Sequence, residues 1–93
     1  MTRTESHKLK IEKRWLDRII AGEKTSELRY NDRDFQKGDR VFMEWTAPYG
    51  RATDKDPGPL SAGITVTITH VLTEVPGLDE GYAVLSFKIG GEA

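Results

Sequence analysis

The sequence has no cysteine, which excludes disulfide bonds and thiolate zinc sites. Only two histidines are present, His7 and His70, so we expect no metal site, and we expect no cofactor. No apolar run approaches the roughly 20 residues that a membrane-spanning helix needs. The opening residues, Met1 to Glu5, also lack the apolar region of a signal peptide. We therefore expect a cytoplasmic protein.

A strong charge of either sign is also missing, since the 93 residues carry a net charge of −1. This balance argues against a dedicated, non-specific nucleic-acid binder, which is normally basic. The charge is nevertheless uneven. Residues 1–29 hold eight basic and five acidic side chains, whereas residues 47–93 hold three basic and six acidic ones. A locally positive face is compatible with the neutral total, and an evenly solvated surface is the alternative.

The length and the composition, with 31% charged and 37% apolar residues, are typical of one soluble domain. We expect residues 1–93 to form a single domain with its core at about 6–89. Residues 47–63 hold three of the four prolines and mixed charges. This composition predicts a long loop, and such loops are often functional or disordered.

Hydrophobic periodicity predicts five strands and one helix. Alternation indicates strands at residues 7–11, 24–30, 40–46, 64–73 and 82–89. In the fourth strand His70 falls on the apolar face, so we interpret it as a core histidine. Between the first two strands, apolar residues that include Trp15 recur at helical spacing. They predict a helix from Glu12 to Ala21, ended by Gly22, with Trp15 in the core.

These elements predict an α+β fold. Five twisted strands with one main helix at an end form a small five-stranded, mostly antiparallel β-barrel. The sequence shows neither internal repeats nor a boundary to a second domain.

The segment from Gly22 to Arg33, G-E-K-T-S-E-L-R-Y-N-D-R, carries most of the functional information. Lys24 follows the helix end, and Glu27 and Arg29 share one face of a strand. Arg29 offers a planar fork to a phosphate or a base edge, while Glu27 accepts from an exocyclic amine or orients Lys24. The alternative is mutual neutralisation of the charges, worth about 0–1 kcal/mol at an exposed site.

The motifs H-K-L-K-I, G-x-K-T-x-E-x-R, K-G-D, T-x-T-I-T-H-V-L and G-Y-A-V-L-S-F-K follow one another in this order. Together they resemble an ASCH domain of the PUA-like superfamily, in its small bacterial and phage branch of unknown function. The resemblance covers about residues 6–89. It implies a PUA-like barrel with a polar cleft beside the helix and a role in binding RNA or a small nucleotide-like ligand.

We expect ligand binding from charged and aromatic residues near that cleft. Arg33 extends the positive rim, and His7 begins the first strand. Tyr49 stands at the root of the long loop, where it is placed to stack on a base. Hydrogen bonding within a turn is the alternative for Arg33, and a structural or surface position is the alternative for His7. The candidate ligand-binding residues are Lys24, Glu27, Arg29, Arg33, His7 and Tyr49.

A hydrolase is the alternative function. One ASCH branch hydrolyses the acetyl amide of acetylated cytidine, and its lysine falls on Lys24. The threonine of that branch falls at Glu27, which departs from the pattern, and Glu74 is the nearby candidate for its downstream glutamate. The resemblance thus implies a small amidohydrolase of an N-acylated nucleoside such as N-acetylcytidine. Lys24 and Glu27 are then the catalytic candidates, and Thr25 is a less favoured nucleophile because neighbouring strand residues point to opposite faces.

We favour the binding module over the hydrolase. A third hypothesis is an interaction protein that uses the loop at 47–63.

Overall fold

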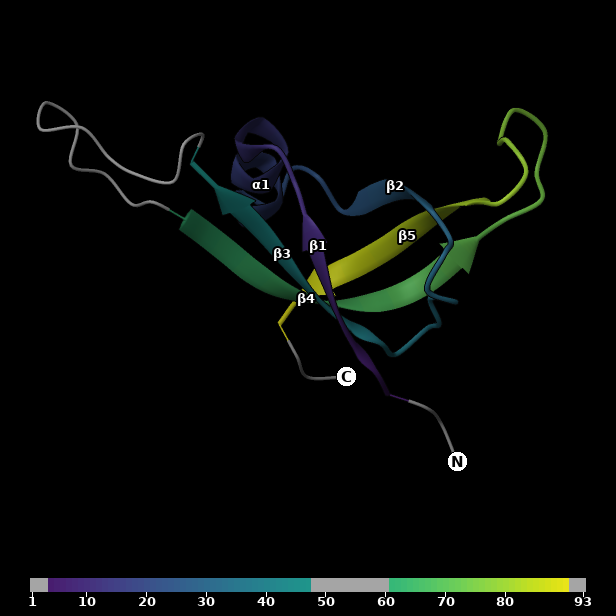
Figure 1. Cartoon of the computed structure of the whole chain (residues 1–93), viewed down its shortest axis with the longest axis horizontal. Helices are drawn as coiled ribbons and strands as arrows, with labels where there is room; N and C mark the ends of the chain where they lie inside the picture. The colour runs from purple at the N-terminus through teal and green to yellow at the C-terminus, as the bar shows by residue number, and fades with distance from the viewer. Residues whose placement is uncertain (1–3, 48–60, 91–93) are drawn as a thin grey trace, which may run out of the picture.

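A five-stranded sheet curls into a half-barrel in the computed structural model, which describes residues 4–47 and 61–90 (Figure 1). The strands lie in the order β1-β3-β4-β5-β2, with β1 and β3 parallel and the other three pairs antiparallel. This confirms the predicted α+β fold with a mostly antiparallel sheet. The elements are β1 (Ser6–Lys10), α1 (Lys13–Ile20), β2 (Ser26–Tyr30), β3 (Arg40–Thr46), β4 (Ser61–Leu72) and β5 (Tyr82–Ile89).

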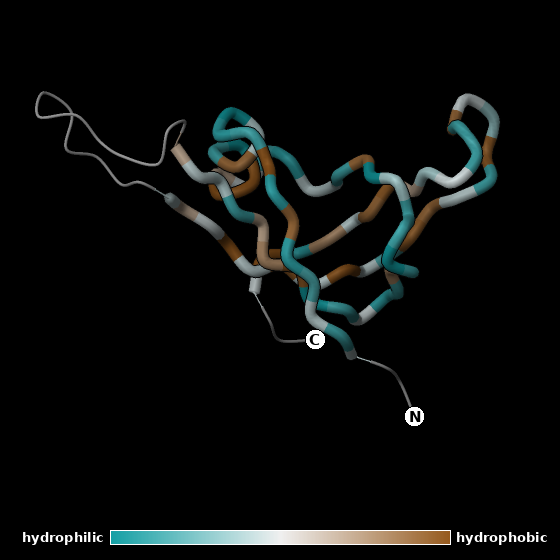
Figure 2. The backbone as a smooth tube through the Cα atoms, in the orientation of Figure 1, coloured by the Kyte–Doolittle hydropathy of each residue, from teal (hydrophilic) through white to brown (hydrophobic). Residues whose placement is uncertain are grey.

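The concave face of the sheet holds the core. Figure 2 shows hydrophobic positions alternating with polar ones along the strands, because successive side chains point to opposite faces. The inward set comes from β1, β3, β4 and β5, and Leu16 and Ile19 of α1 pack onto it. The buried apolar residues are Leu9, Ile11, Leu16, Ile19, Phe35, Val41, Met43, Val66, Ile68, Ala83, Leu85 and Phe87.

The helix α1 buries a narrower stripe than the sequence predicts. Leu16 and Ile19 are buried, Ile20 is 50% exposed and Trp15 is half-buried. The helix starts without a side-chain cap and ends before Gly22, whose φ of +81° suits the left-handed position after a helix. Within the described ranges no helix is long and apolar enough to cross a membrane.

The strand β4 starts earlier than the sequence predicts. Residues 61–63 were expected in a loop, but they pair in register with Glu44, Trp45 and Thr46 of β3. Gly63 permits this pairing, since a Cβ there would stand 2.4 Å from the ring of Phe42. The remainder of the expected loop, residues 48–60, lies outside the described residues, and so does Tyr49.

An irregularity in β4 overturns the expected position of His70. The register with β5 shifts between Ile68 and His70. One additional residue on a strand reverses the facing of the side chains that follow it. His70 is therefore exposed, and Val71 packs against the core in its place.

Asp39 anchors the strands at one end of the half-barrel. Its side chain is fully buried, and Oδ2 accepts hydrogen bonds from His7 Nε2 at 2.9 Å and from the Gln36 amide at 3.1 Å. Oδ1 accepts from the Glu5 amide at 3.1 Å. The Asp39 carbonyl in turn accepts from the amide of Ile68 at 2.8 Å. One residue of the K-G-D motif thereby joins β1, the turn before β3, and β4.

Replacing Asp39 with alanine leaves several buried donors without an acceptor. We expect Asp39→Ala to lower the free energy of unfolding by about 3 kcal/mol, because His7, Glu5 and Gln36 lose the acceptor of their hydrogen bonds. Urea denaturation followed by circular dichroism measures this change. The control is Asp17→Ala on the exposed face of α1, which should change stability by no more than about 0.5 kcal/mol. Similar losses in the two variants would show that Asp39 is not an anchor.

Candidate functional site

The inner face of β2 is polar where the inner faces of the other strands are apolar. Glu27 pairs in register with Leu85, and Arg29 pairs with Ala83, so both charged side chains point to the side of the sheet that holds the core. The Glu27 side chain is 12% exposed and that of Arg29 is 27% exposed. Charges at such positions require partners.

Glu27 supplies these partners by holding two cations. Its Oε1 lies 3.1 Å from Lys24 Nζ, and its Oε2 lies 3.2 Å from an Arg29 guanidinium nitrogen. Lys24 Nζ also donates to the Ser26 carbonyl at 2.5 Å. The structure thus brings together the three residues singled out in the sequence. The cluster carries one net positive charge.

Two arginines link β2 and the turn after it to β1, the opposite edge of the sheet. Arg29 donates to the Lys10 carbonyl, and Arg33 donates to the Lys8 carbonyl at 2.6 Å. Main-chain groups of successive residues in a strand point to alternate sides. The odd-numbered residues of this strand face β3, since the Ile11 amide donates to the Glu44 carbonyl, so the carbonyls of Lys8 and Lys10 point away from β3. The arginine side chains therefore occupy main-chain acceptors of an edge strand.

We call the gap between the edge strands β1 and β2, which the two arginines bridge, the seam. A groove of about 500 Å³, the seam groove, lies along it beside the start of α1. Arg29 Nε is buried there and has no hydrogen-bond partner in the described part of the chain. Tyr30 and Tyr82 pack edge to face beside the groove, with ring centroids 5.4 Å apart. The lining residues are Lys10, Ile11, Glu12, Trp15, Glu27, Leu28, Arg29, Tyr30 and Tyr82.

Trp15 is a site residue that the sequence analysis assigned to the core alone. Its ring packs at the border of the core and lines the groove, and three cations surround it. Arg14 lies 4.4 Å from the ring centroid, Lys24 lies 5.7 Å away and Arg18 lies 5.8 Å away. Cations at such distances interact favourably with the ring face. The sequence carried part of this signal, since Arg18 follows Trp15 by three residues, a spacing at which side chains of a helix are neighbours.

The other described candidates, His7, Arg33 and Thr25, are not part of the cluster around Glu27. His7 is buried against Asp39 and stacks edge to face on Phe35, with ring centroids 4.8 Å apart. Arg33 borders the seam through its bond to β1. Thr25 is exposed and shares with Lys24 a hollow of about 260 Å³ beneath the end of α1.

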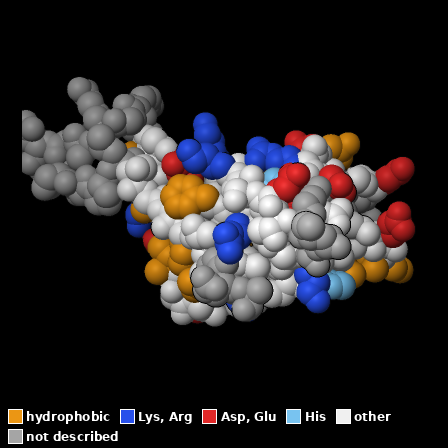
Figure 3. Space-filling view, turned by 90° about the horizontal axis from the view of Figure 1, so that it is seen from below, with side chains coloured by type: hydrophobic (Ala, Val, Ile, Leu, Met, Phe, Trp, Pro, Cys, Tyr) orange, Lys and Arg blue, Asp and Glu red, His pale blue; other side chains and the backbone are white. Residues whose placement is uncertain are grey.

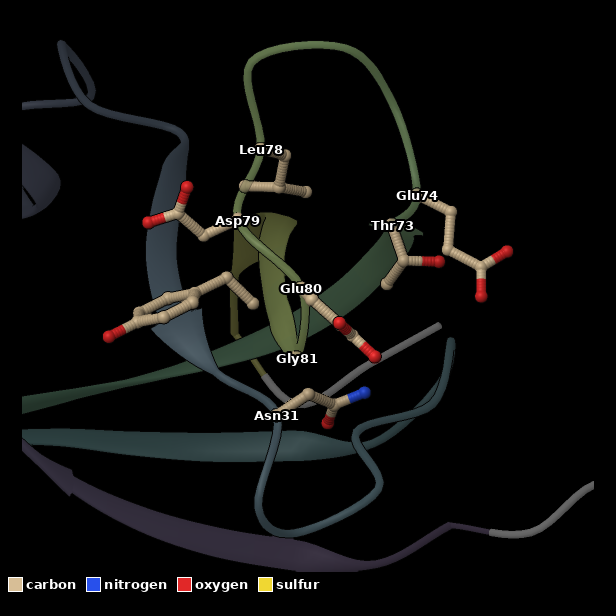
Figure 4. Close-up of a pocket in the computed structure, with 8 residues that line it drawn as sticks. Asn31, Thr73, Glu74, Leu78, Asp79, Glu80 and Gly81 are labelled. Atoms are coloured by element: carbon tan, nitrogen blue, oxygen red, sulfur yellow. The ribbon is translucent and has the colours of Figure 1, made fainter.

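A separate, acidic hollow lies at the other end of β2. It measures about 290 Å³, and the loop between β4 and β5 and Asn31 line it. Figure 4 shows the carboxylates of Glu74, Asp79 and Glu80 pointing apart around it, and the described residues contain no cluster that fits a metal ion. Figure 3 shows acidic side chains at the right-hand end of the face that it draws, with lysines and arginines nearer the middle. An anionic ligand is therefore better accommodated by the seam groove, and Glu74 is not part of the Lys24 cluster.

Glu27 and Arg29 should be coupled energetically, because each is the other's partner of opposite charge. We expect Glu27→Gln and Arg29→Met each to lower the free energy of unfolding by about 1–3 kcal/mol. The double variant should lose about 1–2 kcal/mol less than the sum of the two, since the second change removes a charge that the first left unpaired. Urea denaturation of all four proteins measures the coupling.

The control cycle uses the exposed pair Lys13 and Asp17, whose atoms lie 2.9 Å apart. Lys13→Met and Asp17→Asn should show a coupling below about 0.5 kcal/mol. Additive losses at Glu27 and Arg29 would contradict the role of Glu27 as the partner of Arg29.

Comparison with known proteins identifies a family. A model for a domain of unknown function (DUF3850) matches residues 6–87, which include all of β1, α1, β2, β3 and β4. No curated protein matches the chain. The family's description assigns neither an activity nor a ligand, and it does not name the ASCH domain that the sequence motifs resemble. By a match over most of its length, the chain belongs to the DUF3850 family of domains of unknown function.

Proposed function

We propose that the seam groove binds RNA or a small nucleotide-like ligand, as an ASCH-like binding module. The observation that carries this proposal is that aromatic rings and cations meet at one groove. Trp15, Arg29 and the tyrosine pair line it, and Lys24 Nζ lies 5.7 Å from the centre of the Trp15 ring. A nucleotide presents a flat base and an anionic phosphate, so it needs both kinds of partner.

The cations supply the phosphate contact. Lys24 and Arg29 share the single carboxylate of Glu27, which leaves one positive charge over. Lys10 is exposed at the rim of the same groove and adds to the positive potential. The Arg29 fork is held in place by Glu27 and the Lys10 carbonyl, so little of its side-chain entropy remains to be lost on binding.

The unpaired side of β2 offers main-chain hydrogen-bonding groups to a base. The amide of Asn31 bonds to the Gly81 carbonyl and the amide of Phe87 bonds to the Thr25 carbonyl, so odd-numbered positions of β2 face β5. By alternation the N–H and C=O of Leu28 face the groove. A main-chain donor beside a main-chain acceptor matches the donor and acceptor pattern on the Watson–Crick edge of a base.

The charge balance favours a small ligand or a short strand over a long duplex. A binder of long duplexes neutralises many phosphates and is normally basic. Here the net charge is −1, and the acidic hollow occupies the end of the molecule beyond Tyr82.

Hydrolysis of an N-acylated nucleoside is the second candidate, favoured by the hollow that Lys24 and Thr25 share. The Lys24 ammonium donates to the Ser26 carbonyl and pairs with Glu27, which suits a ligand-binding cation better than a general base. The two candidates differ in whether a product forms.

Binding of short single-stranded RNA should weaken as salt rises, because the ligand's counterions are released on binding. We expect Lys24→Ala to weaken binding and to reduce the slope of log affinity against log salt concentration by about 0.7, the value for one phosphate contact with a single strand. Fluorescence anisotropy with a labelled RNA measures both quantities. A thermal-shift screen with nucleosides and N-acetylcytidine, read also by mass spectrometry, detects small ligands and any product.

Lys37→Ala is the matched control, since it removes an exposed lysine from the turn before β3, at the end of that strand away from the groove. It should leave the affinity unchanged. Equal effects of the two variants, or the absence of binding to any of these ligands, would refute the proposed function. Conversion of N-acetylcytidine to cytidine that Lys24→Ala abolishes would establish the hydrolase instead.

A further inference from the structure

A second groove adjoins the first one on the opposite side of the connection between β1 and α1. It is a shallow, open depression of about 500 Å³, and Lys10, Ile11, Glu12, Lys13 and Trp45 line it. Lys10, Ile11 and Glu12 line both grooves. The two spaces are therefore neighbours across one short ridge, and Figure 1 shows this connection passing between the end of β3 and β2.

The second groove repeats the chemistry of the first one. Lys13 Nζ lies 5.9 Å from the centre of the Trp45 ring, as Lys24 lies 5.7 Å from that of Trp15. The Lys13 side chain is 54% exposed. Each groove thus has one tryptophan with a lysine over its ring, at a place that a ligand can reach.

The position of Trp45 explains why its ring lines the groove. Val41, Met43 and Trp45 follow one another on the inner face of β3, and the first two are fully buried. Trp45 comes next to last in the strand, where the core ends, so it packs only in part against the core. Its partner across the sheet is the small Ala62, which leaves room beside the ring.

We propose that the Trp45–Lys13 groove is a second base-binding subsite, so that the ligand is a single-stranded oligonucleotide of at least two nucleotides. This inference rests on the proposed function of the seam groove. One base stacks in the seam groove and the next stacks beside Trp45, while the phosphodiester between them crosses the ridge near Lys10. A free mononucleotide fills only one of the two grooves. Alternating aromatic rings and cations are the usual platform for single strands, since every base has a stacking face.

The test is the dependence of affinity on strand length. Uridine monophosphate and oligouridylates of increasing length are titrated against the protein, with oligodeoxyuridylates as a parallel series that differs only in the sugar. We expect the affinity to rise about tenfold from the mononucleotide to the trinucleotide, the gain of one additional stacked base. Trp45→Leu, which preserves apolar packing, and Lys13→Gln, at an exposed position, should each remove most of that gain. Both should leave the affinity for the mononucleotide unchanged.

The outcomes separate this inference from the proposed function. If the mononucleotide binds as tightly as the longest oligonucleotide, or if the gain survives both substitutions, the second subsite is wrong and the seam groove stands alone. If no nucleotide of any length binds, the proposed function fails together with the inference. Lys37→Gln is the control and should retain the full gain with length. The DNA series decides whether the sugar is read.

Discussion

The half-barrel depends on how its two edge strands are closed. β1 and β2 end the sheet on opposite sides and do not pair with each other. An edge strand presents main-chain groups that require partners or solvent. Here the guanidinium groups of Arg29 and Arg33 reach across and take the carbonyls of Lys10 and Lys8. Glu27 holds Arg29 in the position from which it bridges.

Because side chains rather than main-chain hydrogen bonds bridge β1 and β2, a groove remains between the two strands. A main-chain ladder would place the strands about 4.8 Å apart and leave no space between them. Two arginines instead close the seam at separate points. The groove beside them retains aromatic walls and a buried Arg29 nitrogen that has no partner among residues 4–47 and 61–90. A ligand with an acceptor group at this place satisfies that nitrogen. The same residues therefore serve both the fold and the proposed binding, with Asp39 holding β1 and β3 at the other end.

The sequence predicted the elements and the charged cluster because both depend on local patterns. Alternation marked the strands, Gly22 marked the end of the helix, and G-x-K-T-x-E-x-R placed Lys24, Glu27 and Arg29 together. The misplacement of His70 has a different origin, since the register shift in β4 leaves no mark in the alternation. The pair of His7 and Asp39 joins residues 32 positions apart, so only the folded chain brings them together. The partial exposure of Trp15 also depends on the folded chain, because it is set by where α1 lies on the border of the core.

The most direct test of the account is a map of the residues that a ligand touches. A titration of the isotope-labelled protein with a short oligouridylate, followed by ¹H–¹⁵N correlation spectra, provides this map. The account predicts that the largest shifts occur at residues 10–15 and 24–30 and at the indole N–H of Trp15, with little change at residues 73–81 around the acidic hollow. Shifts centred on residues 73–81, or spread evenly over the surface, would contradict the claim that the seam between β1 and β2 is the binding site.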